Sequence, residues 1–400
     1  MKYVSILIVL FSISNGWARI AQWELNDVSV LIPLPKEDDR EDFLLKADSQ
    51  GKKGSLFPES QGNVIKDLIV SYERPEPDNI YQSIRVVGMR IDPCFKYTTL
   101  PFEKCHPQLR LVWQPTKGLN TSAVKTFDGA IHTFYELSKE EFSSLAKDLL
   151  RLKQKNKELG ISTVGAPLNI HPAFTSTKRR QSFNDELKNI ILKYAGESNL
   201  SQFTFMKLFT TNLWWSFGGR DKDQRGEWKD MEIQRLSKKD ITQDFFNEDS
   251  FRPTGLRGTI LPDVLVKTDD LSEIINGWGL KDNEEGLKKL KKGFVTINRI
   301  ENPKIHSPAS LDCVHCHITE ATKLWAEKEK PEMFKKAQTG LEAYTQDFIT
   351  RHNLRNVTNK KIHNKSIRAF GHFESNPSVN QRVINESASV ADFMNRQLNF

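Results

Sequence analysis

The pattern of hydrophobic and polar positions changes along the chain. In the first third, β-branched and aromatic residues occur in short runs that are separated by proline and glycine, which is typical of strands. This pattern predicts strands over Trp23–Pro35, Val64–Tyr72, Tyr81–Ile91, Gln108–Gln114 and Ala123–Leu137. The strand spacing is too irregular to indicate an internal repeat.

Helical periodicity begins after Ser138. Ser138 and Glu141 form a capping-box pattern, and apolar residues then recur at helical spacing up to Gly160. Further helices are predicted over Phe183–Tyr194, Asn283–Lys292, Pro331–His352 and Val383–Leu398, and strands over Phe203–Phe217, Leu261–Val266 and Phe294–Ile300. These patterns predict an α+β protein with a strand-rich N-terminal part and a mostly helical C-terminal region.

A partial calcium-loop pattern lies between Trp215 and Trp228. Asp221 and Asp223 occupy ligand positions of such a loop, but Arg225 stands where the pattern requires Asp or Asn. A guanidinium does not suit a cation site, so a polar hairpin is the preferred interpretation.

The composition supports a folded protein with a large core. The 400 residues include 24 Phe and 8 Trp, and 38% of the residues are hydrophobic. The formal net charge of +7 is modest for this length. It favours an acidic partner or an anionic surface slightly, and nucleic acid is not expected as a partner.

Residues 1–18 resemble a cleaved signal peptide. A positive start at Lys2 precedes a short apolar run over Val4–Ile13, and Gly16-Trp17-Ala18 ends in a small-x-small pattern. The mature chain would then begin at Arg19, in the periplasm or outside the cell. An uncleaved anchor or a buried strand is the alternative. No segment approaches the ~18 apolar residues of a membrane span, so the protein is not expected to span a membrane.

Two of the four cysteines, Cys94 and Cys105, stand close together between Pro93 and Pro107. In an oxidising compartment a disulfide that closes this short loop is the expected state. A reactive pair is the alternative.

The other two cysteines belong to the run Cys313-Val314-His315-Cys316-His317. On a helix, positions three and four residues apart share one face, so Cys313, Cys316 and His317 would project together. Two other chemistries fit these residues. The cysteines could hold zinc with His306, His315 or His317, or they could form a small redox disulfide.

The Cys-x-x-Cys-His spacing resembles the haem-attachment site of c-type cytochromes. The resemblance implies one covalent haem c, held through thioethers by Cys313 and Cys316, with His317 as the proximal iron ligand. It also implies a distal Met or His, for which His372, Met394 and Met333 are candidates, in that order; an upstream ligand such as His306 stays open. The resemblance covers only this motif and its helical setting, and the rest of the chain resembles no family.

These observations predict a signal peptide over residues 1–18, a mixed α+β domain over 19–300 and a helical cytochrome c-like haem region over 301–400. The first functional hypothesis is an exported bacterial monohaem protein that passes electrons to a redox partner protein. A haem-dependent periplasmic oxidoreductase is the second. The third is a secreted binding or structural protein whose cysteine motif holds metal or a disulfide.

Overall fold

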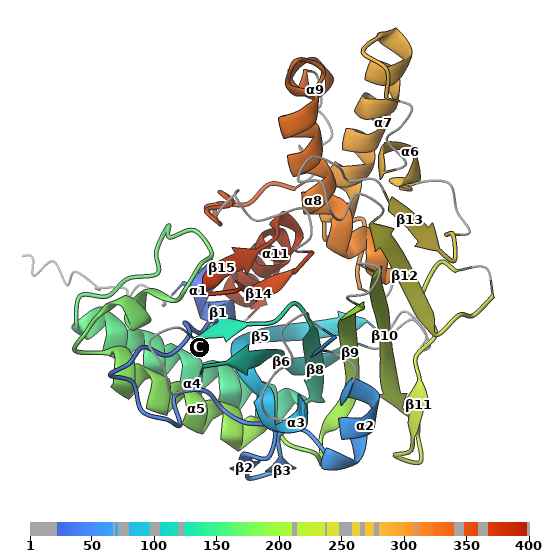
Figure 1. Cartoon of the computed structure of the whole chain (residues 1–400). Coiled ribbons are helices and arrows are strands. Elements are labelled where there is room, and N and C mark those ends of the chain that lie inside the picture. The colour runs from blue at the N-terminus through green and yellow to red at the C-terminus, as the bar shows by residue number, and fades with distance from the viewer. Residues whose placement is uncertain are drawn as a thin grey trace, which may run out of the picture.

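The computed structural model is organised around one large, mostly antiparallel sheet (Figure 1). It describes residues 22–66, 69–70, 80–96, 105–118, 124–209, 214–236, 238–247, 258–264, 269–275, 280–308, 310–339, 348–358 and 367–397. The predicted signal peptide, residues 1–18, lies outside these ranges and stays a prediction.

The sheet has eight strands in its main hydrogen-bonded order. These are β1 (Ser29–Leu31), β5 (Ile84–Lys96), β6 (Cys105–Lys117), β8 (Ala130–Glu136), β9 (Leu200–Phe209), β10 (Trp214–Lys222), β12 (Thr242–Asn247) and β13 (Gly258–Leu261). Three short strands join it at the side, namely β4 (Ile69–Val70), β7 (Lys125–Thr126) and β11 (Trp228–Asp230). Two small hairpins are separate, β2 (Gln50–Gly51) with β3 (Gly54–Ser55) and β14 (Phe370–Phe373) with β15 (Asn376–Val379).

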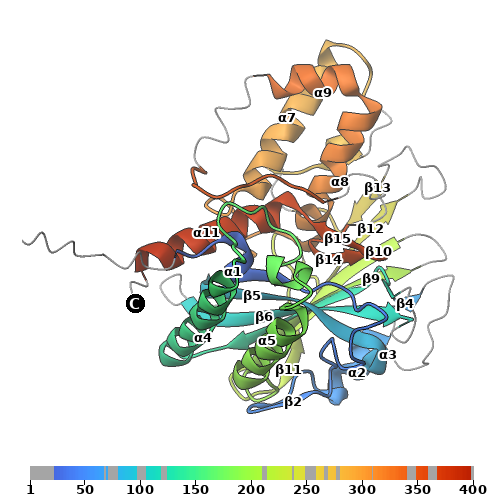
Figure 2. The ribbon, with the colours of Figure 1, turned by 90° about the vertical axis from the view of Figure 1, so that its left-hand side faces the viewer.

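The helices divide between the two faces of this sheet. Short helices are α1 (Leu25–Val28), α2 (Gly62–Ile65), α3 (Ile80–Ser83) and α6 (Ser272–Ile275). The longer ones are α4 (Lys139–Glu158), α5 (Arg180–Tyr194), α7 (Glu284–Glu301), α8 (Cys313–Glu329), α9 (Pro331–Gln338) and α11 (Gln381–Gln397). In Figures 1 and 2, α4 and α5 lie below the sheet, whereas α7, α8 and α9 project above it and α11 crosses over β5.

The lower face of the sheet carries the largest hydrophobic core. Alternate residues of a strand point to opposite faces, so Leu109, Leu111 and Trp113 of β6 share the face that packs against α4 and α5. The predicted capping box starts α4, because Ser138 Oγ accepts a hydrogen bond from the Glu141 backbone N–H and the Glu141 carboxylate accepts one from the Ser138 N–H. This cluster fixes the sheet without using the motif region.

The upper face has two smaller clusters. One joins α11 and the β14–β15 hairpin to residues such as Val87 and Val112 of the sheet. The other joins α6, α7, α8 and α9 to β9, β10, β12 and β13. The predicted boundary between residues 300 and 301 falls at the end of α7, which packs against α8 and α9. The domain division stays a prediction, and hydrophobic contacts cross the proposed boundary.

The α+β prediction is confirmed, including the strand-rich first part and the helical C-terminal region. Three local predictions are wrong. The helix predicted over Pro331–His352 ends at Gln338 as α9, and residues 348–352 are not helical. The strand predicted over Leu261–Val266 lies earlier, as β13, which ends at Leu261.

The predicted helix stop at Gly293 and the strand over Phe294–Ile300 are replaced by the continuous helix α7. A Cβ on Gly293 would stand 1.7 Å from Ile274 Cδ1, so the glycine serves close packing of α6 on α7.

Two other predictions need adjustment. The strand over Trp23–Pro35 begins as helix α1 before β1, and the strand over Phe203–Phe217 is divided between β9 and β10.

The calcium-loop segment forms the β10–β11 hairpin, in which Asp223 Oδ1 accepts hydrogen bonds from the backbone N–H groups of Arg225 and Glu227. The hairpin interpretation is therefore confirmed.

Within the described ranges, no helix has the length and apolar character to cross a membrane.

Cys94 is disulfide-bonded, and β5 and β6, which carry Cys94 and Cys105, pair as neighbours. The side chain of Cys105 lies outside what the structure describes, so its pairing with Cys94 stays a prediction.

Candidate functional site

The cysteine motif forms the first turns of α8. Asp312 caps this helix, since its carboxylate accepts a hydrogen bond of 3.1 Å from the His315 backbone N–H. The side-chain amide oxygen of Gln243, on β12, accepts another from the Val314 N–H at 2.9 Å. The start of α8 is thus fixed to the sheet, and both cysteines are free thiols.

Cys313, Cys316 and His317 line one cavity of about 570 Å³. This volume falls within the roughly 300–1,000 Å³ typical of cofactor and small-molecule sites. The cavity lies between the upper face of the sheet, the start of α8 and the start of α11. The three motif residues therefore share one cavity, as the helical spacing predicted.

The floor of the cavity is the upper face of the sheet, and the strand register shows how it is built. One row of paired positions runs through Arg90, Arg110, Phe134, Gln202 and Asp221. A second row contains Val112, His132 and Thr204, and a third contains Ala130, Met206 and Phe217. All of these residues line the cavity. The floor therefore carries arginine, histidine and amide groups among its apolar side chains.

His317 is held with a defined tautomer. Its Nδ1–H donates a hydrogen bond of 2.8 Å to the Ile367 carbonyl oxygen, and its ring contacts the Phe217 ring with a centroid distance of 5.0 Å. Burial lowers the pKa of His317, and the bond to Ile367 opposes this only in part. The neutral imidazole thus keeps a lone pair on Nε2, which has no hydrogen-bond partner among the described residues.

The two neighbouring histidines of the motif region are engaged elsewhere. His315 lies between two carboxylates, with Nδ1 2.8 Å from Asp312 Oδ1 and Nε2 3.1 Å from Asp270 Oδ1. Burial alone would lower the pKa of His315, but Asp312 and Asp270 raise it to about 9. His306 Nε2 is 3.0 Å from Asp269 Oδ2. Neither ring lines the cavity, so neither shares the position of His317.

The thiols do not have the properties of reactive cysteines. Burial, followed by the charge of Asp312, raises the pKa of Cys313 well above its ordinary value. Burial also raises the pKa of Cys316, to about 11. Redox-active and metal-binding cysteines require a stabilised thiolate. Among the described residues, no group of three or more His, Cys, Asp and Glu is arranged to hold a metal ion.

A cluster of arginines closes the cavity beside α11. Glu386 Oε2 is 3.0 Å from Arg90 Nη2, and Glu386 Oε1 is 2.7 Å from Arg382 Nη2. Burial alone would raise the pKa of Glu386, but Arg382, Arg90 and then Arg110 lower it to about 2. Arg110 also pairs with Asp92 at 2.5 Å. Arg90, Arg110 and Arg382 thus place three guanidinium groups at this end of the cavity, where they pair with the carboxylates of Glu386 and Asp92.

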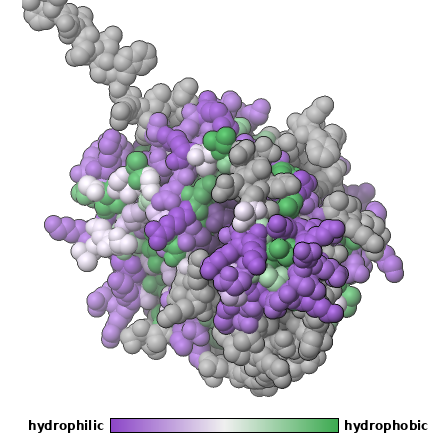
Figure 3. Space-filling view, turned by 90° about the horizontal axis from the view of Figure 1, so that it is seen from above, coloured by the Kyte–Doolittle hydropathy of each residue, from purple (hydrophilic) through white to green (hydrophobic). Residues whose placement is uncertain are grey.

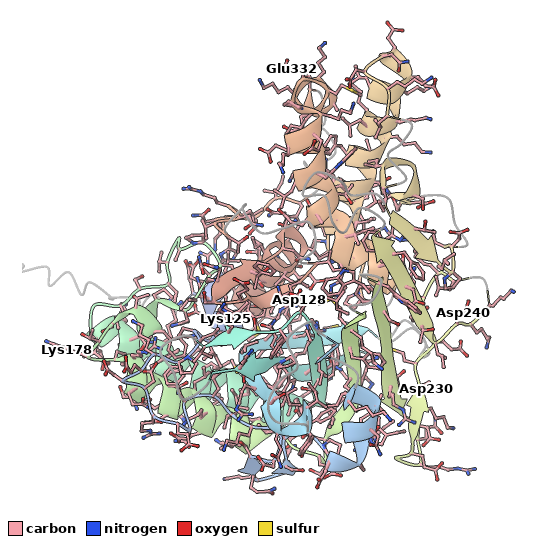
Figure 4. All side chains as sticks on the ribbon, viewed as in Figure 1. Lys125, Asp128, Lys178, Asp230, Asp240 and Glu332 are labelled. Carbon is pink, nitrogen blue, oxygen red and sulfur yellow. The ribbon has the colours of Figure 1, made fainter. Side chains whose placement is uncertain are left out.

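The cavity meets solvent along the β10–β11 hairpin. Its lining there includes Lys229, Asp230 and Lys239, whose side chains are 65%, 54% and 81% exposed. Figure 4 labels Asp230 on this outer strand, and Asp128 beneath the β14–β15 hairpin, where it pairs with Arg368. Seen from above, the described surface is mostly hydrophilic, with hydrophobic residues in small scattered patches (Figure 3). The charged rim marks one route into the cavity.

None of the three candidate distal ligands lines this cavity. His372 is buried on β14, where its Nε2–H donates to the Ile32 carbonyl oxygen at 2.8 Å. Met394 lies in the lower hydrophobic cluster, and Met333 packs among α7, α8 and α9. These candidates stay predictions without support from the cavity.

The structure adds His132, on β8, which the motif could not reveal. Along β8 the residues Ala130, His132 and Phe134 alternate with Ile131 and Thr133. This alternation would have assigned His132 to the same face of the sheet as Arg110 and Thr204. The sequence signal that could have pointed to this site was the clustering of polar residues inside predicted strands.

Comparison with known family models, with curated proteins and with solved structures finds no match for this chain, so the interpretation of its function depends on the cavity at the start of α8.

Proposed function

We propose that the chain is an exported protein that binds one covalent haem c and passes electrons to a redox partner protein. The observation that supports this most is the shared cavity of Cys313, Cys316 and His317. Two thiols and one imidazole on the first turns of a helix, facing one cofactor-sized space, are what covalent haem attachment requires.

The chemistry of attachment is compatible with the state of the thiols. Each S–H adds across one vinyl group of the porphyrin, the sulfur bonding to one carbon and a hydrogen to the other. Two thioethers form with no oxidant or reductant consumed. The raised pKa values of Cys313 and Cys316 favour the neutral thiol over the thiolate that zinc binding requires.

His317 has the arrangement of an iron ligand. Histidines that bind metals usually donate the other ring N–H to a carbonyl or carboxylate, which orients the ring and raises the basicity of the free nitrogen. The Nδ1–H bond to Ile367 has this form. When bound, the haem would supply one-electron exchange at its iron, which no side chain of the cavity provides.

The arginine cluster fits the anionic side of a porphyrin. Arg90, Arg110 and Arg382 all line the cavity and pair there with the carboxylates of Glu386 and Asp92. A propionate is a carboxylate, and guanidinium groups bind carboxylates with strong, directed hydrogen bonds.

A haem-dependent oxidoreductase is the second candidate. The specific observation that favours it is the charged rim along β10 and β11, through which a small substrate could reach the cavity. The third hypothesis, a metal or disulfide at the motif, has less support because His315 and His306 are bound to carboxylates and the thiol pKa values are raised.

The test is expression of the full chain with its leader in a bacterial host that matures c-type cytochromes. The denatured wild-type protein should give a haem stain on a gel, each single variant C313A and C316A should retain a weaker stain, and the double variant should give none. H315N serves as a control for changes in the same helix turn and should keep the stain. A wild-type protein without stain would contradict the proposal.

A further inference from the structure

His132 occupies the middle of the cavity floor. It lies on β8 and pairs in register with Val112 of β6 and Thr204 of β9, so its side chain projects from the upper face of the sheet. Counted along the register, His132 lies two strands and two residues from Phe217, whose ring contacts His317. His132 and His317 line the same cavity from the sheet and from α8.

The imidazole of His132 has no hydrogen-bond partner among the described residues. In each fully buried histidine of the described chain, by contrast, at least one ring nitrogen has a partner. His171 accepts from the Ala173 N–H at 3.1 Å, His372 donates to Ile32, and His315 and His352 contact carboxylates. A polar ring inside a protein is normally satisfied. The exposed part of His132 faces the cavity instead, which indicates a partner that occupies the cavity.

The electrostatic setting keeps this ring neutral. Burial, followed by the charges of His317, Arg90 and Arg110, lowers the pKa of His132 to about 3. A neutral imidazole presents one lone pair, which is the form that binds iron.

We propose that His132 is the second axial ligand of the haem iron, so that two imidazoles, from β8 and α8, hold it. This rests on the proposed haem attachment and refines it. A second strong ligand would leave no open position for peroxide or another small molecule, and would therefore favour electron transfer over the oxidoreductase alternative. Met206, also on the floor, carries a thioether sulfur that could bind the iron instead.

The experiment compares optical and paramagnetic spectra of the haem-loaded wild-type protein, H132A, H132M and M206L. The wild type should show a low-spin iron with two imidazole ligands and bind no carbon monoxide when reduced. H132A should become high-spin and bind one equivalent of carbon monoxide per haem, and added imidazole should restore the low-spin spectrum. H132M should give the optical signature of a methionine ligand, which a structural role for His132 would not produce.

The matched control is H372A, because His372 is also buried but lies outside the cavity. It should leave the wild-type spectrum unchanged. The inference is overturned if the wild type already binds carbon monoxide, if H132A keeps a low-spin spectrum, or if only M206L opens the iron. A wild type without covalent haem would instead reject the proposed function, and the haem stain distinguishes that outcome.

Discussion

The two faces of β6 show how differently the two sides of the sheet are built. Leu109, Leu111 and Trp113 point down and are fully buried against α4, α5 and the neighbouring strands. Arg110 and Val112, the residues between them, point up toward the cavity. The lower face is a continuous hydrophobic core, whereas the upper face leaves space and places charges in its wall. The difference indicates that stability is concentrated below the sheet and ligand binding above it.

The largest expected effect is on the lower face. Trp113 is completely buried, and its indole N–H donates to Thr133 Oγ1 at 2.8 Å. W113A should lower the free energy of unfolding by about 3–5 kcal/mol, because it leaves a cavity and removes the indole donor from the Thr133 hydroxyl. Urea unfolding measures this, with W113F as the milder control. The haem spectrum of any folded W113A should stay unchanged, and a loss below about 1 kcal/mol would contradict the division between the faces.

The next effect concerns Glu386 in the cavity wall. Because its pKa is lowered to about 2, the folded state binds a proton less readily than the unfolded state, where the pKa is near 4.5. Its contribution to stability is therefore present above about pH 4.5 and is lost as the pH falls through about 2. E386Q should cost about 3 kcal/mol at pH 7, and the difference from wild type should narrow toward pH 3.

Unfolding of wild type and E386Q across this pH range provides the measurement. E41Q is a suitable control, since Glu41 lies on the surface and carries the same change in charge. A difference that stays constant with pH would show that the arginines do not stabilise the ionised form of Glu386.

The smallest expected effect is the difference in stability loss between substitutions at two neighbouring positions of β6. L111A should cost about 2–5 kcal/mol, because Leu111 is packed on all sides in the lower core. V112A should cost only about 1–2 kcal/mol, because it removes only two methyl groups from Val112, which is buried in the smaller upper cluster and lines the cavity. V112A, unlike L111A, should shift the haem absorption spectrum. Equal losses of stability for the two variants would contradict the comparison.

Sequence patterns within a few residues predicted much of this fold. They failed where an element depends on residues from a distant part of the chain. The capping box at Ser138 and the spacing of the haem motif depend on residues within one turn, so sequence alone was sufficient for them. The continuation of α7 through Gly293 depends on Ile274 from another helix, and no pattern around Gly293 carries that information.

The candidate site also has a part that the sequence predicted and a part that only the structure shows. Cys313, Cys316 and His317 are close in sequence and were predicted together. His132 comes from β8, and the cavity above it forms only because α8 and α11, much later in the chain, cover that part of the sheet. Strand alternation could assign the face of His132 but not what lies over it. His372 looked suitable because aromatic residues and a glycine surround it, and these pack β14 against the sheet instead.

The intact mass of the exported wild-type protein after denaturation, from a host that matures c-type cytochromes, tests covalent haem attachment most directly. The expected mass is that of the chain from Arg19 plus one haem. This added mass should disappear in the C313A/C316A double variant. A wild-type mass equal to that of the unmodified mature chain would contradict the central claim that the start of α8 holds a covalent haem.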